Sequence, residues 1–241
     1  MKRRPIVALA GGVGAARFLD GLARVTAPER VYIIGNTADD AEIHGLHISP
    51  DLDTVTYTLA GMANPEHGWG IRGDNFRCLE ALGRLGADNW FQLGDVDLAT
   101  HLYRTERLRA GANLAQVTGE ITRALNVRAT LVPMSNERVR TRICTPQGEL
   151  EFQTYFVKRR ARDRVTAIRF EGASEAAPRR VYWMRSQAPK RFCSAHRIRS
   201  SVSARSSRSR ASAMHCGFGV RASPRFRPSW EGARSRVRRR R

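Results

Sequence analysis

Residues 5–35 read PIVALAGGVGAARFLDGLARVTAPERVYIIG, and this stretch decides the fold class. A short apolar run ends at the glycines of residues 11–14, and a segment with helical spacing of its apolar side chains follows. VYIIG, at residues 31–35, is a second apolar run. Strand, glycine loop, helix and strand in this order are typical of a βαβ unit with parallel strands. The sequence therefore predicts an α/β fold with a Rossmann-like parallel sheet and helices on both of its faces.

The following residues continue the alternation of helices and strands. The expected helices are residues 53–62, 75–86, 98–111 and 113–127, and the expected strands are residues 129–135, 140–160 (a hairpin) and 165–172. Asn113 is the expected N-cap of the last helix. Polar clusters follow the strands, and open α/β sheets place their ligands at that edge.

A change in composition after Pro178 divides the chain. The 241 residues include 42 Lys and Arg against 22 Asp and Glu, a net charge of +20. Residues 1–178 hold 23 basic and 21 acidic residues, whereas residues 179–241 hold 19 basic residues and 1 acidic residue and are rich in Arg and Ser. We expect an α/β domain over residues 1–178 and a disordered tail over residues 179–241, because sparse apolar residues with high net charge cannot bury enough surface to fold.

Cysteine usage and apolar runs indicate a cytoplasmic protein without a membrane segment. The four cysteines show no metal or disulfide spacing, which suits reduced thiols; they are Cys78, Cys144, Cys193 and Cys216. The apolar run of residues 5–10 is too short for a signal peptide and ends in glycines. No segment approaches the roughly 18 apolar residues that a membrane helix requires.

The glycine loop is the first candidate site. Gly11, Gly12 and Gly14 lie between a strand and a helix. Glycines there let backbone N–H groups approach a phosphate, and the helix dipole favours its charge. The alternative is a tight turn that only packs the helix on the strand.

Two pairs of acidic residues follow. Asp39 and Asp40 come after the second strand, where carboxylates can hold Mg²⁺ or form a solvated turn. Asp51 and Asp53 flank one apolar residue just before a helix. Helix capping explains one of these two carboxylates well and the second less well.

Aromatic and polar residues in later loops are further candidates. Trp69 lies between two glycines, where it could stack on a planar ligand or pack in the core. Gln92 precedes the helix that carries His101 and Arg104, and a lone histidine on a helix is more often structural than catalytic. No Ser/His/Asp or Cys/His arrangement stands out, so covalent catalysis has little support.

Taken together, these loops resemble one family. The chain contains, in order, GGVGAARFLDGL, GNTADD, HGLHISPDLDTVTYTLAG, GWGIRGDN, FQLGDVDLATHLYRT and VPMSNERVRTRI. Over residues 5–178 it resembles the 2-phospho-L-lactate transferases, also called phosphoenolpyruvate transferases, of coenzyme F-420 biosynthesis. The resemblance implies a Mg²⁺-dependent enzyme that moves a 2-phospholactyl or phosphoenolpyruvyl group from a guanosine diphosphate-linked donor to the deazaflavin Fo and releases GMP.

The resemblance also implies residue roles. Asp53 and Gln92 fall where the family contacts Fo, although the family often has Lys or Arg at the Gln92 position. Donor phosphate and metal are expected beside the glycine loop, with these residues: Gly11, Gly12, Gly14, Asn36 and Thr37 for phosphate, Asp39 and Asp40 for Mg²⁺. We expect Asp53 and Asp51 to act in catalysis, and Trp69 and Arg104 to contact substrate. On this basis Asp53→Asn should leave folding intact and lower turnover at least roughly tenfold.

The resemblance stops at residue 178, where the family continues with further strands and helices. Residues 180–237 can be back-translated with GC-biased codons and read two bases later. The shifted frame can give an amino-acid sequence with the apolar periodicity of helices and strands, and it includes PNPIVSIGPI, a segment like the missing half. We therefore attribute the tail to a frameshift, in the gene or in its sequencing. The C-terminal part of the fold should then be incomplete, and the chain should be a poor enzyme or inactive.

Two other functions stay open. A genuine basic tail would bind nucleic-acid phosphates, but it has few interleaved aromatic residues to stack on bases, so we expect no selected nucleic-acid partner. Nucleotide-sugar-binding regulators of carbon metabolism share the Gly-rich start, whereas residues 50–54 and 94–105 favour the transferase. The sequence leaves open which three-carbon phosphate the donor carries and whether the protein forms a homodimer.

Overall fold

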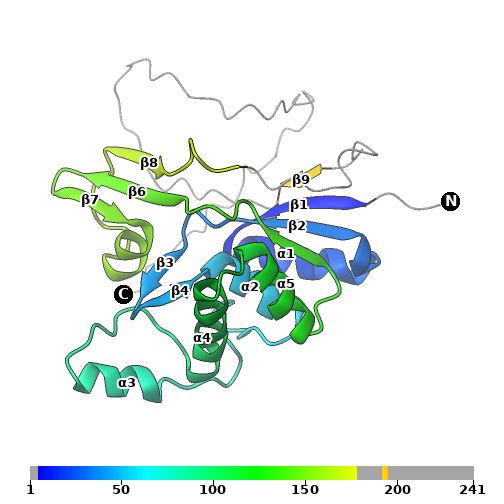
Figure 1. The fold of residues 1–241 in the computed structure, drawn as a ribbon, viewed down its shortest axis with the longest axis horizontal. Helices are drawn as coiled ribbons and strands as arrows, with labels where there is room; N and C mark the ends of the chain where they lie inside the picture. Colours follow the sequence, from blue (N-terminus) through cyan, green and yellow to red (C-terminus); the bar gives the residue numbers. More distant parts are fainter. Residues whose placement is uncertain (1–4, 178–191, 195–241) are drawn as a thin grey trace, which may run out of the picture. The chain divides into compact units, whose positions relative to one another are not determined.

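The computed structural model describes residues 5–177 and 192–194, and it contains the expected βαβ unit (Figure 1). β1 (Ile6–Ala10) leads into α1 (Gly12–Val25), and β2 (Val31–Gly35) then pairs parallel with β1. The apolar runs of residues 5–10 and 31–35 therefore form adjacent strands. The prediction of a parallel α/β sheet is confirmed.

The parallel sheet has the strand order β5-β2-β1-β9. β5 (Thr130–Pro133) pairs with β2, and β9 (Phe192–Ser194) pairs with β1. β9 was not expected, because it lies in the segment of residues 179–241 predicted to be disordered. Any extended backbone can pair with a strand edge, so a side-chain pattern does not reveal such a strand. The rest of that prediction falls outside the described residues.

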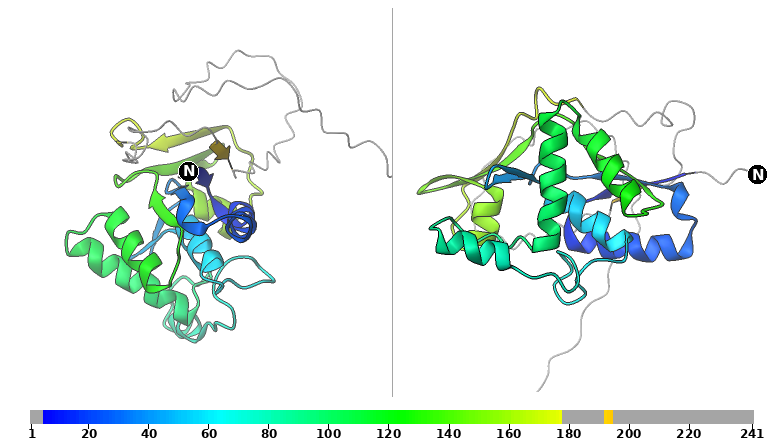
Figure 2. Two further views of the ribbon diagram at one scale, coloured as in Figure 1. Left: turned by 90° about the vertical axis from the view of Figure 1, so that its right-hand side faces the viewer. Right: turned by 60° about the horizontal axis from the view of Figure 1, so that its bottom comes forward.

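The described helices lie to one side of this sheet (Figure 2). The sheet is contacted by α1, α2 (Pro50–Leu59) and α5 (Leu114–Ala124), whereas α4 (Asp95–Arg109) packs beside α5 and α3 (Arg77–Arg84) packs beside α4. Asn113 is the N-cap of α5 as predicted, and with Gln116 it forms a capping box. α2 and α4 begin earlier than the apolar spacing indicated, because their first turns carry acidic residues, which favour a helix N-terminus.

The two faces of the sheet are covered differently within the described residues. Val31 and Ile33 of β2 are buried in the core with side chains of α1 and α2, whereas Tyr32 and Ile34 on the alternate positions are only partly buried. A parallel sheet ordinarily has both faces covered. The second layer of helices that the sequence predicted is not among the elements described.

Two small antiparallel sheets flank the parallel sheet. β3 (Ala41–Ile43) and β4 (Leu46–Ile48) form a hairpin, and β6 (Arg140–Thr145) lies between β7 (Gly148–Glu151) and β8 (Ala167–Glu171). The β3–β4 hairpin was missed because its strands are too short to show alternation. The predicted hairpin of residues 140–160 is correct through β7, but a π-helical turn, Thr154–Lys158, replaces its final part.

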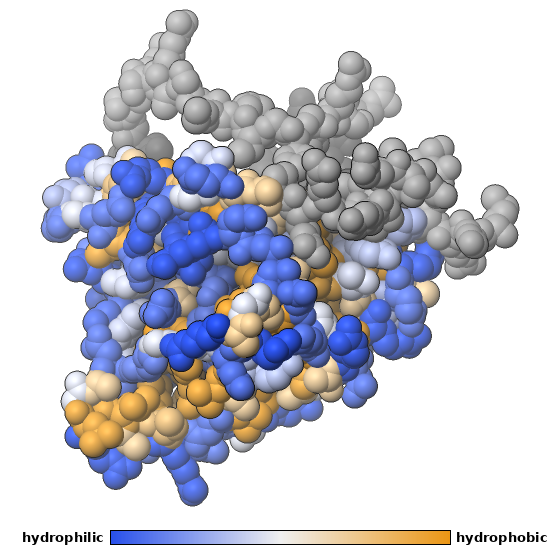
Figure 3. All heavy atoms as spheres, viewed as in Figure 1, coloured by the Kyte–Doolittle hydropathy of each residue, from blue (hydrophilic) through white to orange (hydrophobic). Residues whose placement is uncertain are grey.

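The face drawn in Figure 3 shows several exposed apolar areas, and one of them lies over α3. Leu85, at the C-terminus of α3, is 84% exposed. None of the helices in the described residues is both long and apolar enough to span a bilayer.

Candidate functional site

The glycine loop at the start of α1 faces an acidic side chain. Gly12 has φ of +69°, a left-handed conformation that glycine adopts without strain. α1 has no side-chain cap and no acidic residue in its own first turn. Instead the Asp51 carboxylate, from α2, lies against the Gly12 backbone amide. The loop predicted to bind a phosphate therefore has a carboxylate beside it.

Asp51 belongs to an acidic cluster at the end of β2. Asn36 Nδ2 donates to Asp39 Oδ2 at 2.9 Å and to Asp51 Oδ2 at 2.8 Å, so one amide bridges two carboxylates. Burial raises the pKa of Asp51 to about 7, and the nearby charges of Asp39 and Asp40 act in the same direction against the Asn36 and Gly12 contacts. We call Asn36, Asp39 and Asp51 the acidic cluster.

Asp40 has a different environment from Asp39. It is buried, and its Oδ2 accepts from Ser49 Oγ at 2.9 Å and lies 3.1 Å from His47 Nε2. Burial raises the pKa of Asp40 although His47 and Ser49 oppose the shift. Asp40 is thus engaged with the β4 segment, whereas Asp39 lies with Asp51.

The acidic cluster suits a magnesium ion that is completed by substrate. No three Asp, Glu, His or Cys side chains in residues 5–177 and 192–194 converge to hold a metal ion unaided. Mg²⁺ is usually held by one or two carboxylates together with substrate phosphates, and it keeps several waters. Asp39 and Asp51 supply two carboxylates, and Thr37 Oγ1 is buried nearby in sequence without a hydrogen-bond partner in this part of the chain. The donor set fits the ion.

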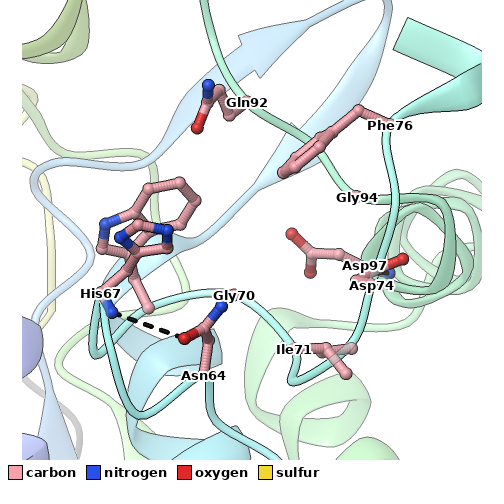
Figure 4. Close-up of a pocket in the computed structure, with 10 residues that line it drawn as sticks. Asn64, His67, Gly70, Ile71, Asp74, Phe76, Gln92, Gly94 and Asp97 are labelled. Carbon is pink, nitrogen blue, oxygen red and sulfur yellow. Dashed lines mark hydrogen bonds between the residues drawn. The ribbon is translucent and has the colours of Figure 1, made fainter.

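A hollow lies between the loop of residues 64–76 and the start of α4 (Figure 4). Its lining residues are Asn64, His67, Trp69, Gly70, Ile71, Asp74, Phe76, Gln92, Gly94 and Asp97. The rings of His67 and Trp69 stack with centroids 5.3 Å apart, and Trp69 is 38% exposed. The structure thus brings Trp69 and Gln92, both predicted to contact substrate, to one hollow with an aromatic wall.

Two contacts hold the loop of the hollow in place. Asp74 accepts hydrogen bonds from the backbone N–H groups of Val96 and Asp97, so it caps α4 from outside the helix. A Cβ at Gly94 would overlap the Asp74 carboxylate, which explains the glycine there. A Cβ at Gly68 would lie 2.5 Å from Val13 of α1, so the loop also packs beside the glycine loop. The hollow and the acidic cluster are therefore neighbouring regions.

A buried polar network lies behind the hollow. Arg104, only 2% exposed, donates to both carboxylate oxygens of Asp53, and its Nη1 lies 3.2 Å from His101 Nδ1. His101 Nε2 lies 3.3 Å from Asp97 Oδ1, which also accepts from Tyr57 OH at 2.6 Å. We call these five residues the buried network.

Asp53 and Arg104 form the ion pair of the buried network. Burial opposes the charge of Arg104, but Asp53 outweighs it and raises the pKa of Arg104. Burial would also raise the pKa of Asp97, but His101 and Tyr57 hold that pKa below its usual value. The lining of the hollow includes neither Asp53 nor Arg104. Asp53 and Arg104, two of the four residues predicted to contact substrate, form a buried ion pair, and their contact with substrate stays a prediction.

Three residues of this region escaped the sequence reasoning. Asp74, Asp97 and Tyr57 lie in the quoted motifs, but each was treated as part of a loop or helix rather than as a site residue. The signal was available for Asp97, which lies four residues before His101 on one helix face. Only the fold could show that Tyr57 and Asp74 meet α4.

Comparisons with known proteins identify a family for this chain. Residues 6–184 match the family of the 2-phospho-L-lactate transferase CofD. The chain is similar to the phosphoenolpyruvate transferase of Streptomyces griseus, with 44% identity over 178 residues that cover 72% of this chain and 56% of that protein. It is also similar to the 2-phospho-L-lactate transferase of Methanopyrus kandleri, with 42% identity over 174 residues and the same coverage, 72% and 56%.

A solved structure is also similar. It is that of a UPF0052 family member from Bacillus halodurans, with a TM-score of 0.47 and 18% identity, covering 75% of this chain and 54% of that chain. The family match, however, spans most of this chain, which is therefore a member of a transferase family built on a parallel α/β sheet. The chain belongs to the 2-phospho-L-lactate transferase CofD family. It spans 56% of the length of the relatives named above.

Proposed function

We propose that this chain represents the part of a transferase that binds the deazaflavin acceptor and the phosphates of the donor. The reaction moves a 2-phospholactyl or phosphoenolpyruvyl group from a guanosine diphosphate-linked donor to Fo and releases GMP. The observation that carries this proposal is the proximity of an aromatic hollow to an acidic cluster at the glycine loop, within a chain of this family.

The donor phosphates belong at the glycine loop. The first-turn amides of α1 have no acidic partner within the helix, and the helix dipole favours an anion there. Asp51 is the obstacle, because its carboxylate already lies against Gly12. A bound cation would remove this repulsion, so phosphate and cation should bind together.

Mg²⁺ would be held by Asp39 and Asp51 with the donor phosphates as further ligands. When bound, it would neutralise the charge that develops on the transferred phosphoryl group. Asn36 orients both carboxylates through its single amide nitrogen. Asp51, predicted to be catalytic, would thus act by holding charge next to the phosphates.

The acceptor belongs in the hollow. A planar deazaflavin ring can stack on the exposed Trp69 and its partner His67. Gln92 is exposed at the rim and can donate or accept hydrogen bonds. Because the loop carrying Trp69 packs on α1, a hydroxyl of the bound acceptor would approach the glycine loop.

The chemistry then depends on alignment. The acceptor hydroxyl oxygen forms a bond to the phosphorus and loses its proton to solvent, the bond to the GMP oxygen breaks, and GMP leaves with that electron pair. Phosphoryl transfer needs positioning and charge stabilisation more than covalent help from the protein. Asp53, which the family resemblance places at the acceptor, would act through Arg104 by holding the network behind the hollow.

The test is a direct binding and turnover measurement. Fo fluorescence should change on titration with the chain. With the frame-restored protein, GMP should form only when Fo, Mg²⁺ and a guanosine diphosphate-linked donor are all present. GMP formation would be followed by chromatography. Binding of a nucleotide sugar without any binding of Fo would contradict the proposal and favour a regulator on the same fold.

A further inference from the structure

Asp74 and Asp97 line the hollow, and only in Asp74 do both carboxylate oxygens accept hydrogen bonds from the described part of the protein. Asp74 Oδ1 accepts from the backbone N–H groups of Asn75 and Val96, at 2.8 and 2.9 Å. Its Oδ2 accepts from the backbone N–H of Asp97 at 3.0 Å. Asp74 therefore belongs to the frame of the hollow.

Asp97 has an oxygen without a protein partner. Tyr57 OH donates to Oδ1 at 2.6 Å, and His101 Nε2 approaches the same Oδ1 at 3.3 Å. Within residues 5–177 and 192–194, Oδ2 of Asp97 has no hydrogen-bond donor. The residue lines the hollow and is 9% exposed, so this oxygen lies where a bound ligand would exclude the remaining water.

The surroundings keep Asp97 ionised and oriented. His101 and Tyr57 hold its pKa below the usual value despite burial, and the buried Arg104 adds to this effect. An ionised carboxylate is an acceptor only, so it recognises N–H and O–H groups and rejects carbonyl oxygens. Burial and the neighbouring carboxylates of Asp53 and Asp97 raise the pKa of Tyr57, so its hydroxyl keeps its proton and donates a hydrogen bond to Asp97.

We propose that Asp97 binds the acceptor directly: its Oδ2 accepts a hydrogen bond from an N–H or O–H on the edge of a planar heterocycle stacked on His67 and Trp69. Tyr57 and His101 are positioning residues that hold this carboxylate. The inference rests on the proposed function, in which the heterocycle is the deazaflavin Fo. Asp97 on α4 thereby adds a polar contact to the ligand, beside the stacking on the aromatic wall and the contact with Gln92.

The experiment measures Fo binding to the full chain by fluorescence titration, with GDP as a separate probe of the donor side. Asp97→Asn should weaken Fo binding at least about tenfold, since it removes a charge-assisted hydrogen bond in a buried setting. Binding of GDP should stay unchanged. The matched control is Asp95→Asn, which removes the same charge from the same helical turn but from a carboxylate that accepts from the Cys78 backbone N–H.

A second variant separates positioning from folding. Tyr57→Phe leaves the Asp97 carboxylate in place but removes the hydroxyl that orients it. It should weaken Fo binding by a smaller factor, about threefold to fivefold, with GDP binding unchanged; this variant decides the question if Asp97→Asn does not fold.

The outcomes are distinct. If the unaltered chain does not bind Fo, the proposed function and this inference both fail. If it binds Fo and neither variant weakens binding, only the inference is overturned. If Fo and GDP binding fall together with the melting temperature in both variants, Asp97 has a structural role alone, which also overturns the inference.

Discussion

Carboxylates gather in two neighbouring regions of this domain, beside the glycine loop and behind the hollow, and their surroundings differ. In the acidic cluster, Asp39 and Asp51 share one neutral amide, and the pKa of Asp51 is raised to about 7. In the buried network, Asp53 is paired with Arg104, and the pKa of Asp97 is lowered. Burial and neighbouring acids thus raise the pKa of Asp51 in one region, whereas Asp53 has an arginine partner in the other.

The difference indicates two different tasks. A carboxylate whose pKa is raised by burial and by neighbouring acids, as for Asp51, gains stability from a cation, so it suits a site that receives Mg²⁺ with substrate phosphates. In the buried network, Arg104 already provides a positive charge to Asp53. The network can hold one carboxylate, Asp97, rigidly enough to recognise a hydrogen-bond donor. The comparison therefore separates the donor side from the acceptor side of the proposed reaction.

The largest expected effect concerns whether these two regions suffice for turnover. We expect the codons from 179 onward, read two bases later, to give an open frame like the family's missing half. The frame-restored protein should transfer the group to Fo with Mg²⁺, whereas the chain as given should be at or near background. The physical reason is the open face of β2, where Tyr32 and Ile34 are only partly covered by the described residues.

Sequencing the gene and assaying both proteins side by side checks this expectation. A stop codon soon after the shift would refute the frameshift. Comparable activity of the two proteins would show that the acidic cluster and the hollow are sufficient, and the account of a missing half would then be wrong.

The next effect is on stability, at the Asp53–Arg104 pair of the buried network. Arg104→Met should lower the free energy of unfolding by about 3–5 kcal/mol, because it leaves the buried Asp53 carboxylate without its partner. Urea denaturation measures this change. Asp53→Asn should also destabilise the protein because it leaves Arg104 without its partner, and the expectation that the variant still folds stays a prediction.

The double variant Asp53→Asn/Arg104→Met should recover much of this loss, since neither charge is then buried alone. Arg107→Met is the matched control, because the Arg107–Glu120 pair is partly exposed, and its loss should cost no more than about 1 kcal/mol. If Arg104→Met and Arg107→Met lower the free energy of unfolding equally, burial does not make the Asp53–Arg104 pair more important than a partly exposed pair.

The sequence could predict the fold because strong local patterns coincide with the elements. The apolar runs of residues 5–10 and 31–35 around the glycine loop gave the parallel pair, and Asn113 marked the start of α5. The hairpin β3–β4 and the strand β9 depend on backbone pairing over three residues each, which leaves no period to detect. The motifs also led to the family, which the comparisons confirm.

The candidate site was less predictable because contacts between distant residues decide it. The sequence led to Asp51, Trp69 and Gln92, and the structure places the last two in one hollow. It could not show that Arg104 faces Asp53, a pair 51 positions apart in the chain. Nor could it distinguish Asp39 from Asp40, which are adjacent in sequence but contact different segments.

A smaller effect tests the raised pKa of Asp51, in solution without metal ions. Since the pKa of Asp51 is 3.8 in its ordinary state and about 7 in the fold, the folded protein holds the proton more tightly. Stability is therefore full at low pH and is lost as pH rises from about 4 to about 7. Asp51→Asn should be more stable than the unaltered chain at pH 8, by about 1–4 kcal/mol, with less than half of that gain left at pH 5.

Urea denaturation with EDTA at the two pH values measures this difference. Asp20→Asn, which removes an exposed carboxylate paired with Arg24, is the control and should show no such pH dependence. Adding Mg²⁺ should stabilise the unaltered chain more than Asp51→Asn. If the two proteins differ in free energy of unfolding by the same amount at pH 8 and pH 5, the fold does not raise the pKa of Asp51.

The smallest expected effect tests how the hollow is attached to α4. The N-cap residue of α4, Gly94, has no side chain, and Asp74 takes its place by accepting from the N–H groups of Val96 and Asp97. Asp74→Ala should lower the free energy of unfolding by about 0.5–2 kcal/mol, the usual cost of losing a helix cap. Because the same carboxylate anchors the loop that carries Trp69, Fo binding should weaken as well.

Asp88→Ala is the control for this last variant, because Asp88 is an exposed carboxylate whose partner is Lys158 on the surface. Thermal unfolding and Fo titration of both variants give the comparison. If Asp74→Ala loses stability but binds Fo normally, the cap serves α4 alone and the loop is held by its packing on α1 at Gly68. If it loses both, the hollow depends on α4 for its shape, and Asp97 and Trp69 are then positioned by one and the same contact.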